Sequence, residues 1–533
     1  MRLSSVAKLS SSAAALALLS LSTSATASNA FEVPDHGVEQ FGRGGAWVAR
    51  ASDPMAAWFN PAALATQSSG VSLGVSLLWT RTCFNRVNPD GSPKQIEDSH
   101  AVAPKTRIYP ETCNEDPYKP FPNPSLAGNF RVNDKLAIGL AVLGPHASGD
   151  AEWPDVVDAT DRDGNYAPAP SPTRYLLIKK HGLILNPTLS VAYSVTPDLH
   201  FGAGFTWGIA SLEFTAITGS LERNPEGWTQ DIGADLKVKD WFVPGVVVGG
   251  LWEAHSRIDV GAWFRWSDAI KAKGDAYLYG DYYDVWGIPN EESDYCVVGN
   301  TKGPQNCTRT PSGQTKVRLN QPMEAKLGIR YHHPRNGVAP KTNSQGNRVR
   351  DPLAEDLFDI EVDFTYARNS VVENLEIRFP EGIELPWKGG ATVPVNADVP
   401  HHFKDVFGVR VGGDYVILPN ELAVRVGGFF ETRGQDPAFA NIDFVPAQRF
   451  GLTAGLTYRV GPVDINVAGG HVFGSKIDNE GQGDIPALVG TATSKYPSRT
   501  KGEDIHFRTP YAINDGWVQE SVTIAQVGAT YRF

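Results

Sequence analysis

Charged side chains recur at alternating positions within otherwise apolar segments of this 533-residue chain. The cations are Arg265, Lys326, Arg330, Arg410 and Arg425, and the carboxylates near them are Asp259, Glu361, Asp363, Asp414 and Glu431. A guanidinium group shielded from water either pairs with a carboxylate of the protein or binds the anionic end of another molecule. For any single arginine we expect a ladder of internal ion pairs. As candidate anion-binding residues we single out Arg265, Arg330, Arg410 and Arg425.

Neither catalytic nor metal chemistry has a convincing pattern. The adjacent pairs His332-His333 and His401-His402 would point to opposite faces of a strand, so neither pair is suited to chelate one metal ion. The chain also lacks an HExxH motif. We therefore expect no enzyme activity, no metal and no cofactor. The formal net charge of −11 disfavours nucleic acid, whose phosphates repel an acidic surface.

The first residues predict export. Arg2 and Lys8 precede an apolar run that ends near Leu21, and small residues follow up to Ala27 and Ala30. This order is typical of a secretory signal peptide, and the apolar run is too short and too rich in serine for a membrane-spanning helix. We assign residues 1–30 to the signal peptide, with cleavage after Ala27 or after Ala30.

Four cysteines in an exported chain are expected to form disulfides. Proximity in the sequence favours Cys83 with Cys113 and Cys296 with Cys307, although three pairings are possible. Each of these pairs would lie within one long loop, where a disulfide would act as a structural staple.

The elements that must position these residues are strands. Alternation of apolar and polar residues predicts about fourteen of them, each bounded by Gly, Pro, Asn or Asp. The segments are 70–82, 124–132, 134–144, 183–195, 198–215, 243–253, 256–268, 320–332, 356–369, 403–417, 420–432, 449–460, 462–474 and 520–533. After residue 30 there is no apolar run of about 18 residues, so the mature chain has no candidate transmembrane helix.

The connections alternate between short turns and long polar segments. Asn133-Asp134, Pro419-Asn420 and Gly461-Pro462 are typical short turns, whereas 83–123 and 269–319 are long. Outer-membrane barrels have short periplasmic turns, long extracellular loops and an even number of strands. The stretch 333–355 should be a short turn in this scheme, and the sequence does not explain its length.

The two faces of the strands differ in character. Segment 420–432 places Leu422, Val424, Val426, Gly428 and Phe430 on one face, and Arg425 and Glu431 on the other. The last segment alternates in the same way and ends on Phe533, as outer-membrane strands do at the periplasmic aromatic girdle. A soluble β-sandwich would also alternate, but this C-terminus and the signal peptide favour a membrane barrel.

About forty residues between the signal peptide and the first strand do not alternate. The run Ala46–Ala57 has room for one short helix, and Asn60-Pro61 would end it. A small segment ahead of a large barrel is expected to lie in the lumen as a plug. Phe31, Val33 and Phe41 would then line a ligand slot or anchor the plug by packing, and both interpretations remain open.

These N-terminal residues resemble the FadL/TodX-type outer-membrane transporters of long-chain fatty acids and aromatic hydrocarbons. The resemblance rests on Phe31-Glu32-Val33, on Gly42-Arg43-Gly44-Gly45-Ala46 and above all on Phe59-Asn60-Pro61-Ala62. It implies a fourteen-stranded barrel with an N-terminal hatch and with sideways release of ligand into the membrane. Gly42, Asn60, Pro61 and Ala62 match the hatch and gating positions. The long outer loops that contain the cysteines depart from the family pattern.

We therefore expect an all-β transmembrane barrel with a signal peptide (1–30), a lumenal hatch (31–69) and a barrel (70–533). Its expected function is passive uptake of hydrophobic small molecules, with long-chain fatty acids first among them. The alternatives are a general porin and a surface adhesin. Expected partners are the hydrophobic ligand, outer-membrane lipids and the barrel assembly machinery, and the protein is expected to be a monomer in the Gram-negative outer membrane.

Overall fold

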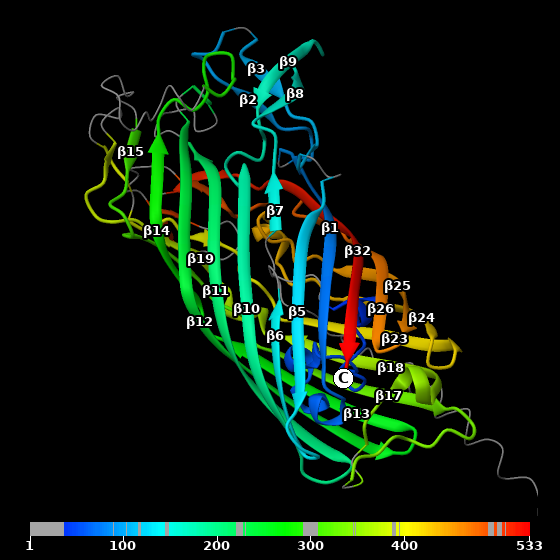
Figure 1. Cartoon of the computed structure of the whole chain (residues 1–533). Helices are drawn as coiled ribbons and strands as arrows, with labels where there is room; N and C mark the ends of the chain where they lie inside the picture. Colours follow the sequence, from blue (N-terminus) through cyan, green and yellow to red (C-terminus); the bar gives the residue numbers. More distant parts are fainter. Residues whose placement is uncertain are drawn as a thin grey trace, which may run out of the picture.

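Fourteen antiparallel strands close into a barrel in the computed structural model (Figure 1). The model describes residues 37–533 except 89, 103, 116–118, 144–148, 220–226, 230, 291–306, 345, 347, 386–390, 394, 489–494, 498–503 and 507. Each barrel strand pairs with the next, and β1 pairs with β32 to close the sheet. The strands are β1 (Gly70–Arg86), β5 (Phe121–Arg131), β6 (Leu136–Leu143), β10 (Lys179–Ser194), β11 (Leu199–Thr218), β12 (Ile232–His255), β13 (Ile258–Ser267), β17 (Glu324–Pro334), β18 (Asp356–Ala367), β23 (Val406–Leu418), β24 (Leu422–Glu431), β25 (Arg449–Val460), β26 (Val463–Gly474) and β32 (Gly516–Arg532).

All fourteen predicted segments overlap one of these strands, so the predicted fold class is confirmed. Periodicity succeeds here because a barrel wall with different environments on its two sides forces period-two alternation on every strand. Among the described residues, no helix is long and apolar enough to cross a membrane.

Shorter strands extend and cover the upper end of the barrel (Figure 1). Some of them continue the wall: β4 (Thr112–Cys113), β7 (Gly149–Glu152), β14 (Ile270–Tyr279), β15 (Cys307–Arg309), β16 (Thr315–Leu319), β19 (Asn374–Arg378), β22 (Val399–Pro400) and β27 (Ile477–Asp478). Others form small separate sheets: β2 (Gln95–Glu97), β3 (Thr106–Ile108), β8 (Val156–Thr160) and β9 (Tyr166–Pro170); β20 (Glu384–Leu385) and β21 (Ala391–Thr392); β28 (Pro486–Leu488) and β31 (Arg508–Ala512); β29 (Lys495–Pro497) and β30 (Asp504–His506). Among the described residues, the helical turns outside the N-terminal segment are α5 (Pro352–Glu355), η2 (Asn369–Val371) and η4 (Pro437–Phe439).

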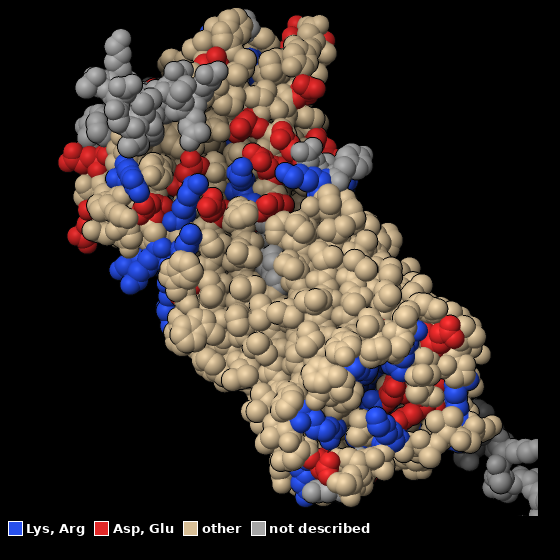
Figure 2. Space-filling view, viewed as in Figure 1, with Lys and Arg blue, Asp and Glu red and all other residues tan. Residues whose placement is uncertain are grey.

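The wall is apolar outside and polar inside. On β24, Val426 is 67% exposed whereas Arg425 is 3% exposed. On β13, Trp266 points outward and Asp259 is fully buried. Figure 2 shows the result as a broad band free of Lys, Arg, Asp and Glu, with charged side chains at both of its ends. This band is the surface that a bilayer would cover.

The lower end carries the short turns, and one connection there is long. Turns such as 419–421 and 461–462 join neighbouring strands directly, whereas 335–355 runs between β17 and β18 and contains α5. The upper end carries the long connections. The predicted alternation of connection length is therefore present, including its one exception.

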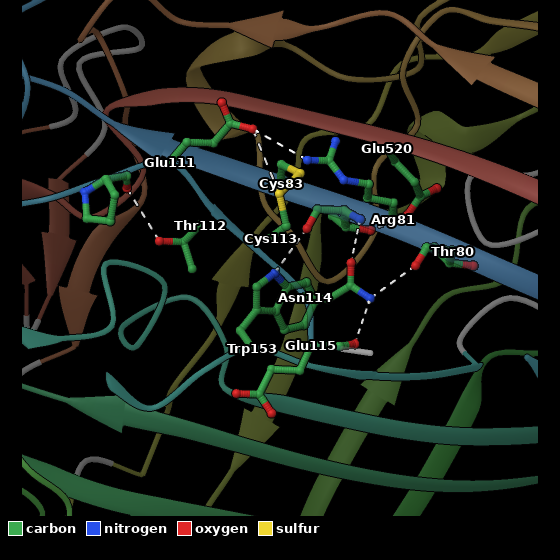
Figure 3. Close-up of a disulfide and its surroundings, with 12 residues drawn as sticks. Thr80, Arg81, Cys83, Glu111, Thr112, Cys113, Asn114, Glu115, Trp153 and Glu520 are labelled. Atoms are coloured by element: carbon green, nitrogen blue, oxygen red, sulfur yellow. Dashed lines mark hydrogen bonds and ion pairs between the residues drawn. A yellow bond between two sulfur atoms is a disulfide. The ribbon is translucent and has the colours of Figure 1, made fainter. Parts of the chain in front are cut away.

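A disulfide joins Cys83 and Cys113 as predicted. Cys83 lies on β1, not in a loop, because β1 continues to Arg86 and its outer part pairs with β4. Figure 3 shows Arg81 and Glu111 beside the disulfide, 3.8 Å apart. Asn114 donates to the carbonyl of Thr80 at 3.0 Å and accepts from the backbone N–H of Thr82 at 2.7 Å. The crosslink therefore ties the end of the first outer connection to the wall.

Of the second predicted pair, Cys296 and Cys307, one cysteine lies among the described residues. Cys307, at the start of β15, is disulfide-bonded, and Cys296 lies outside the described residues. The one group of described residues with metal-ligand spacing is Cys83, Glu111 and Cys113. Two of its three ligand atoms are joined to each other in the disulfide, so this group is not suited to hold an ion.

Replacing both Cys83 and Cys113 by Ala is expected to lower the free energy of unfolding by about 2–4 kcal/mol, because the crosslink closes a long loop in the unfolded chain. Denaturant unfolding in phospholipid vesicles measures this change. Limited proteolysis should also cut the segment between the two positions faster, while the barrel keeps its heat-modifiable migration. Ser99→Ala, in the same connection, is the control and should behave as wild type. Equal cleavage rates in both variants would show that the crosslink does not restrain this connection.

Candidate functional site

Residues 37–69, here called the inner segment, contact the inward faces of the strands. Every residue from Gly37 to Gln67 is buried. The segment contains α2 (Val38–Gly42), α3 (Ala56–Phe59) and η1 (Pro61–Thr66). The short helix expected within 46–57 forms only at the end of that run, as α3, and the rest of the run is non-helical. Positive φ at Gly44, Gly45 and Ala51 turns the chain between the two short helices.

Glycines allow this segment to touch the wall backbone to backbone. A Cβ on Gly44 would lie 2.5 Å from the backbone nitrogen of Gly428, and one on Gly412 would lie 2.1 Å from the carbonyl oxygen of Arg43. Gly427 has the same close approach to Arg43. Any side chain at these positions would push the segment off the wall, so the glycines of β23 and β24 form its seat.

Two arginines of the inner segment are paired with carboxylates of the wall. Arg43 donates to Asp359 at 2.7 Å and to Asp414 at 2.6 Å. Arg50 donates to the same two carboxylates at 2.5 and 3.0 Å, and to Glu39 at 2.7 Å. Each of these side chains is at least nine-tenths buried. Such charges are stable inside a protein only when their partners are in place.

Two further carboxylates of β18 bind the backbone of the inner segment. Asp363 accepts from the N–H groups of Trp47 and Val48 at 2.8 and 3.1 Å. Glu361 accepts from those of Ala49 and Arg50 at 2.6 and 3.1 Å. A segment without regular secondary structure thus has its buried donors satisfied by the wall. β18 therefore provides most of the polar attachment of this stretch.

The candidate anion-binding arginines all have protein carboxylates as partners. Arg265 pairs with Glu324 and lies over the Trp58 ring, 4.8 Å from its centroid. Arg330 contacts Asp259, Asp356 and Asp359 at 2.5–2.9 Å. Arg410 pairs with Glu431 at 2.7 Å, and Arg425 pairs with Asp414 at 3.2 Å. This arrangement is the internal ion-pair ladder. Lys326 lies over the Trp263 ring at 4.7 Å.

The hatch-motif residues contact two neighbouring strands. Asn60 donates to the carbonyls of Val48 and Gly250 at 2.8 and 3.1 Å, and its side-chain oxygen accepts from Ala62 N–H at 3.2 Å. Asn60 ends α3 and precedes η1, so the expected helix-ending role is present. A Cβ on Gly249 would lie 2.1 Å from the Asn60 oxygen, and one on Gly202 would lie 2.4 Å from the Pro61 carbonyl carbon. The motif therefore shapes and seats the chain.

The aromatic candidates are described in part. Phe41 is fully buried in an apolar cluster with Val38, Phe429, Ala468, Val472, Val522 and Ile524, which is the packing interpretation. Gly42 lies against the stem of Arg425. Phe31 and Val33 lie outside the described residues, as does the signal peptide.

The long connection 335–355 attaches to the inner segment from below. Arg350 donates to the carbonyl of Ala49 at 2.9 Å and pairs with Asp259. Its backbone N–H donates to the carbonyl of Thr66 at 2.7 Å. Asn343 donates to the carbonyl of Asp134, in the turn between β5 and β6, at 2.8 Å. The long connection thus reaches from the β17–β18 side of the barrel to the β5–β6 turn, which accounts for its length.

The upper part of the lumen is different in character, because its inward faces are apolar. Leu212, Leu236, Val317, Leu319 and Phe444 belong to one buried cluster there. Two described cations lie beside it, of which Lys180 donates to the carbonyl of Asp443 at 2.7 Å. His401 contacts Asp443 at 2.8 Å. Burial lowers the pKa of His401, whereas its contact with the Asp443 carboxylate raises it. The second effect outweighs the first, so the pKa of His401 lies above its usual value.

A second paired group lies in the outer connections. Arg174 donates to Asp231 at 2.8 Å, and both side chains are fully buried. Burial raises the pKa of Asp231 to about 7, although Arg174 acts in the opposite direction. These charged pairs hold the outer connections together above an apolar lumen.

An apolar exterior, a closed antiparallel wall and a charged interior define this chain as a membrane β-barrel of the outer-membrane type. The sequence matches the family of outer membrane protein transport proteins (OMPP1/FadL/TodX) over residues 18–334. This match covers more than half of the chain, which therefore belongs to that family of outer-membrane transporters of hydrophobic compounds. The match ends at Pro334, directly before the long connection 335–355.

Solved structures show the same fold. A Pseudomonas aeruginosa FadL homologue aligns with a TM-score of 0.64 at 16% identity, over 94% of this chain and 99% of its own. The Ralstonia pickettii toluene transporter TbuX gives 0.53 at 15% identity, over 94% and 100%. The monoaromatic hydrocarbon channel CymD gives 0.53 at 14% identity, over 94% and 99%. A search of curated proteins finds no match.

Arg43→Ala is expected to lower the free energy of unfolding by about 3–5 kcal/mol, because it removes one partner from two buried carboxylates. Denaturant unfolding in vesicles measures this loss, and hydrogen exchange should rise first within residues 37–66. Arg162→Ala is the control, since its pair with Glu97 is exposed and little change is expected. If Arg43→Ala were as mild as the control, the ion pairs would not hold the inner segment.

Proposed function

We propose that this barrel carries hydrophobic small molecules across the outer membrane by diffusion, and that residues 31–69 act as its hatch. The observation that carries the proposal is the seat of residues 37–67 against β11, β12, β18, β23 and β24. This seat supports a closed resting state, whereas a general porin needs a water-filled lumen. The apolar upper lumen supports entry of an apolar molecule. Such a molecule would lose little free energy when it leaves lipid or another hydrophobic surface for this lumen.

The hatch is attached by contacts of two kinds, which allows it to be released in two steps. The ion pairs of Arg43 and Arg50 hold the part near β18 and β23. Asn60 and Pro61 hold the part near β11 and β12 through hydrogen bonds and backbone contacts. Moving the second part would break fewer buried ion pairs than moving the first, and it would therefore cost less free energy. We therefore place the mobile end of the hatch at residues 56–66.

Long-chain fatty acids are the substrate class that the family resemblance places first. A fatty-acid carboxylate would have to displace a protein carboxylate from Arg265, Arg330, Arg410 or Arg425, because each of these is already paired. A neutral hydrocarbon requires no such exchange. The ion-pair ladder thus favours neutral hydrophobic compounds as a second substrate class. Two of the similar structures are described as a monoaromatic hydrocarbon channel and a toluene transporter.

Binding measurements separate the two substrate classes. Purified protein in detergent should bind radiolabelled oleate if fatty acids are carried, and excess toluene should compete only if both use the same path. Planar bilayers should show little steady conductance in either case. Binding of toluene without binding of oleate would exclude fatty acids as substrate, and large steady conductance would favour the porin.

Asn60→Ala is expected to lower uptake of the hydrophobic substrate several-fold, because the hatch loses its hydrogen bonds to Val48 and Gly250 and is no longer held in register. Uptake of labelled substrate into whole cells measures the effect, and heat-modifiable migration checks folding. Asn165→Ala, on an exposed turn, is the matched control. Unaltered uptake in a folded Asn60→Ala variant would count against gating by this segment.

A further inference from the structure

A row of cations crosses four neighbouring strands on the outer surface of the wall. Lys239 on β12 is directly opposite Lys273 on β14, Lys273 is opposite Lys316 on β16, and Lys316 is opposite Arg378 on β19. The three lysines are exposed. Like charges directly opposite each other destabilise a sheet. Three such pairs in succession therefore call for a compensating anion.

The carboxylates nearby are engaged with other groups. Glu213 pairs with Lys237 at 3.3 Å and Asp268 pairs with Lys271 at 2.6 Å. Asp275 pairs with Arg309 at 2.5 Å, and Asp240 accepts from the backbone N–H of Lys271 at 2.6 Å. Arg378 has Asp398 and Glu376 beside it. Within the described part of the chain, neither Lys273 nor Lys316 lies within 4.0 Å of a carboxylate.

The wall is hollowed at the same place. A cavity of about 580 Å³ opens over β11, β12 and β14, and its lining includes Lys237, Lys239, Lys271 and Lys273. Figure 2 shows blue side chains, with red ones between them, along the upper edge of the uncharged band, on the side where Figure 1 labels β12, β14 and β19. The same lining includes Glu213, Asp240 and Asp275, which are engaged with other groups as described above. Lys239 and Lys273 thus line the recess, and Lys316 lies directly opposite Lys273 on the next strand.

The position of the lysine row relative to the bilayer indicates which anion lies next to it. Trp241 and Phe242 on β12 and Trp207 on β11 are 67%, 47% and 51% exposed, and Trp207 donates to the carbonyl of Trp241 at 2.9 Å. Exposed aromatic side chains of this kind mark the bilayer interface. Lys239 lies two residues farther out on the same strand, about 7 Å away. Lipid phosphate groups lie at this level, and the apolar wall below offers Phe205 and Val246 to acyl chains.

We propose that Lys239, Lys273 and Lys316 form a binding site for the phosphate groups of an outer-leaflet glycolipid such as lipopolysaccharide. Lys239 and Lys273 bind phosphate oxygens in the recess, and Lys316, opposite Lys273, binds them beside it. The acyl chains of the same lipid pack on the wall beneath Trp241. The site depends on the placement of the barrel in the outer membrane and is independent of what the barrel transports.

The test compares Lys239→Ala/Lys273→Ala/Lys316→Ala with the wild type. The control is Lys105→Ala/Lys119→Ala/Lys404→Ala, which removes the same charge from exposed lysines in outer connections. Native mass spectrometry in detergent measures the affinity for purified lipopolysaccharide. We expect roughly 100-fold weaker binding in the first variant, from the usual contribution of a basic residue near a charged membrane surface, and no change in the control.

Two further measurements test whether positive charge is what matters and whether the bound phosphate belongs to the lipid. The variant Lys239→Arg/Lys273→Arg/Lys316→Arg should keep the affinity, and dephosphorylated lipopolysaccharide should bind the wild type as weakly as intact lipid binds the alanine variant. Without lipid, the alanine variant should unfold no earlier than wild type, because it has lost like-charge repulsion. Equal binding of dephosphorylated lipid, or unchanged binding by the alanine variant, would overturn the proposal. Full competition by inorganic phosphate at equal concentration would assign the site to free phosphate instead.

Discussion

Charge pairing across the interface between wall and inner segment is the constraint on which the interior depends. Asp359 and Asp414 lie on neighbouring strands with their carboxylates pointing inward, and Arg43 and Arg50 from the inner segment contact both. Removing a buried carboxylate from water costs several kcal/mol unless a cation compensates it. The wall is therefore electrostatically complete only when the inner segment is in place. The same segment cannot be buried without the carboxylates of β18, which accept its backbone N–H groups.

Glycine placement follows from the same constraint. Ion pairs as short as these need the two backbones to be close, and Gly412 and Gly427 permit that approach near Arg43. On the other side, Gly202 and Gly249 make room for Asn60 and Pro61. Small residues and charges thus occur together on the inward face. The outward face of the same strands keeps the bulky apolar residues that lipid requires.

The strands and their faces could be predicted from the sequence because each depends on local alternation. Arg425 and Val426, for example, are adjacent yet belong to different environments, and period two is enough to separate them. The attachments of the interior could not be predicted in this way. In the sequence, Arg43 is only one residue of a glycine-rich run, and Arg350 lies in a long connection that carries no periodic pattern. Their partners lie hundreds of residues away, where no periodic signal links them. The glycines beside Arg43 have no side chains that could pair with it. They are the one local sign that its partners lie elsewhere in the chain.

The separation of these partners along the chain has a consequence for biogenesis. Arg43 finds Asp414 across 371 residues and Asp359 across 316, and β1 cannot close against β32 until the last strand exists. The amino-terminal piece is therefore made long before β18 and β23, which carry the carboxylates that neutralise Arg43. Closure of so long a loop is slow. A wall that lacks β18 and β23 would therefore have no partners for Arg43, and the inner segment could not be seated in it.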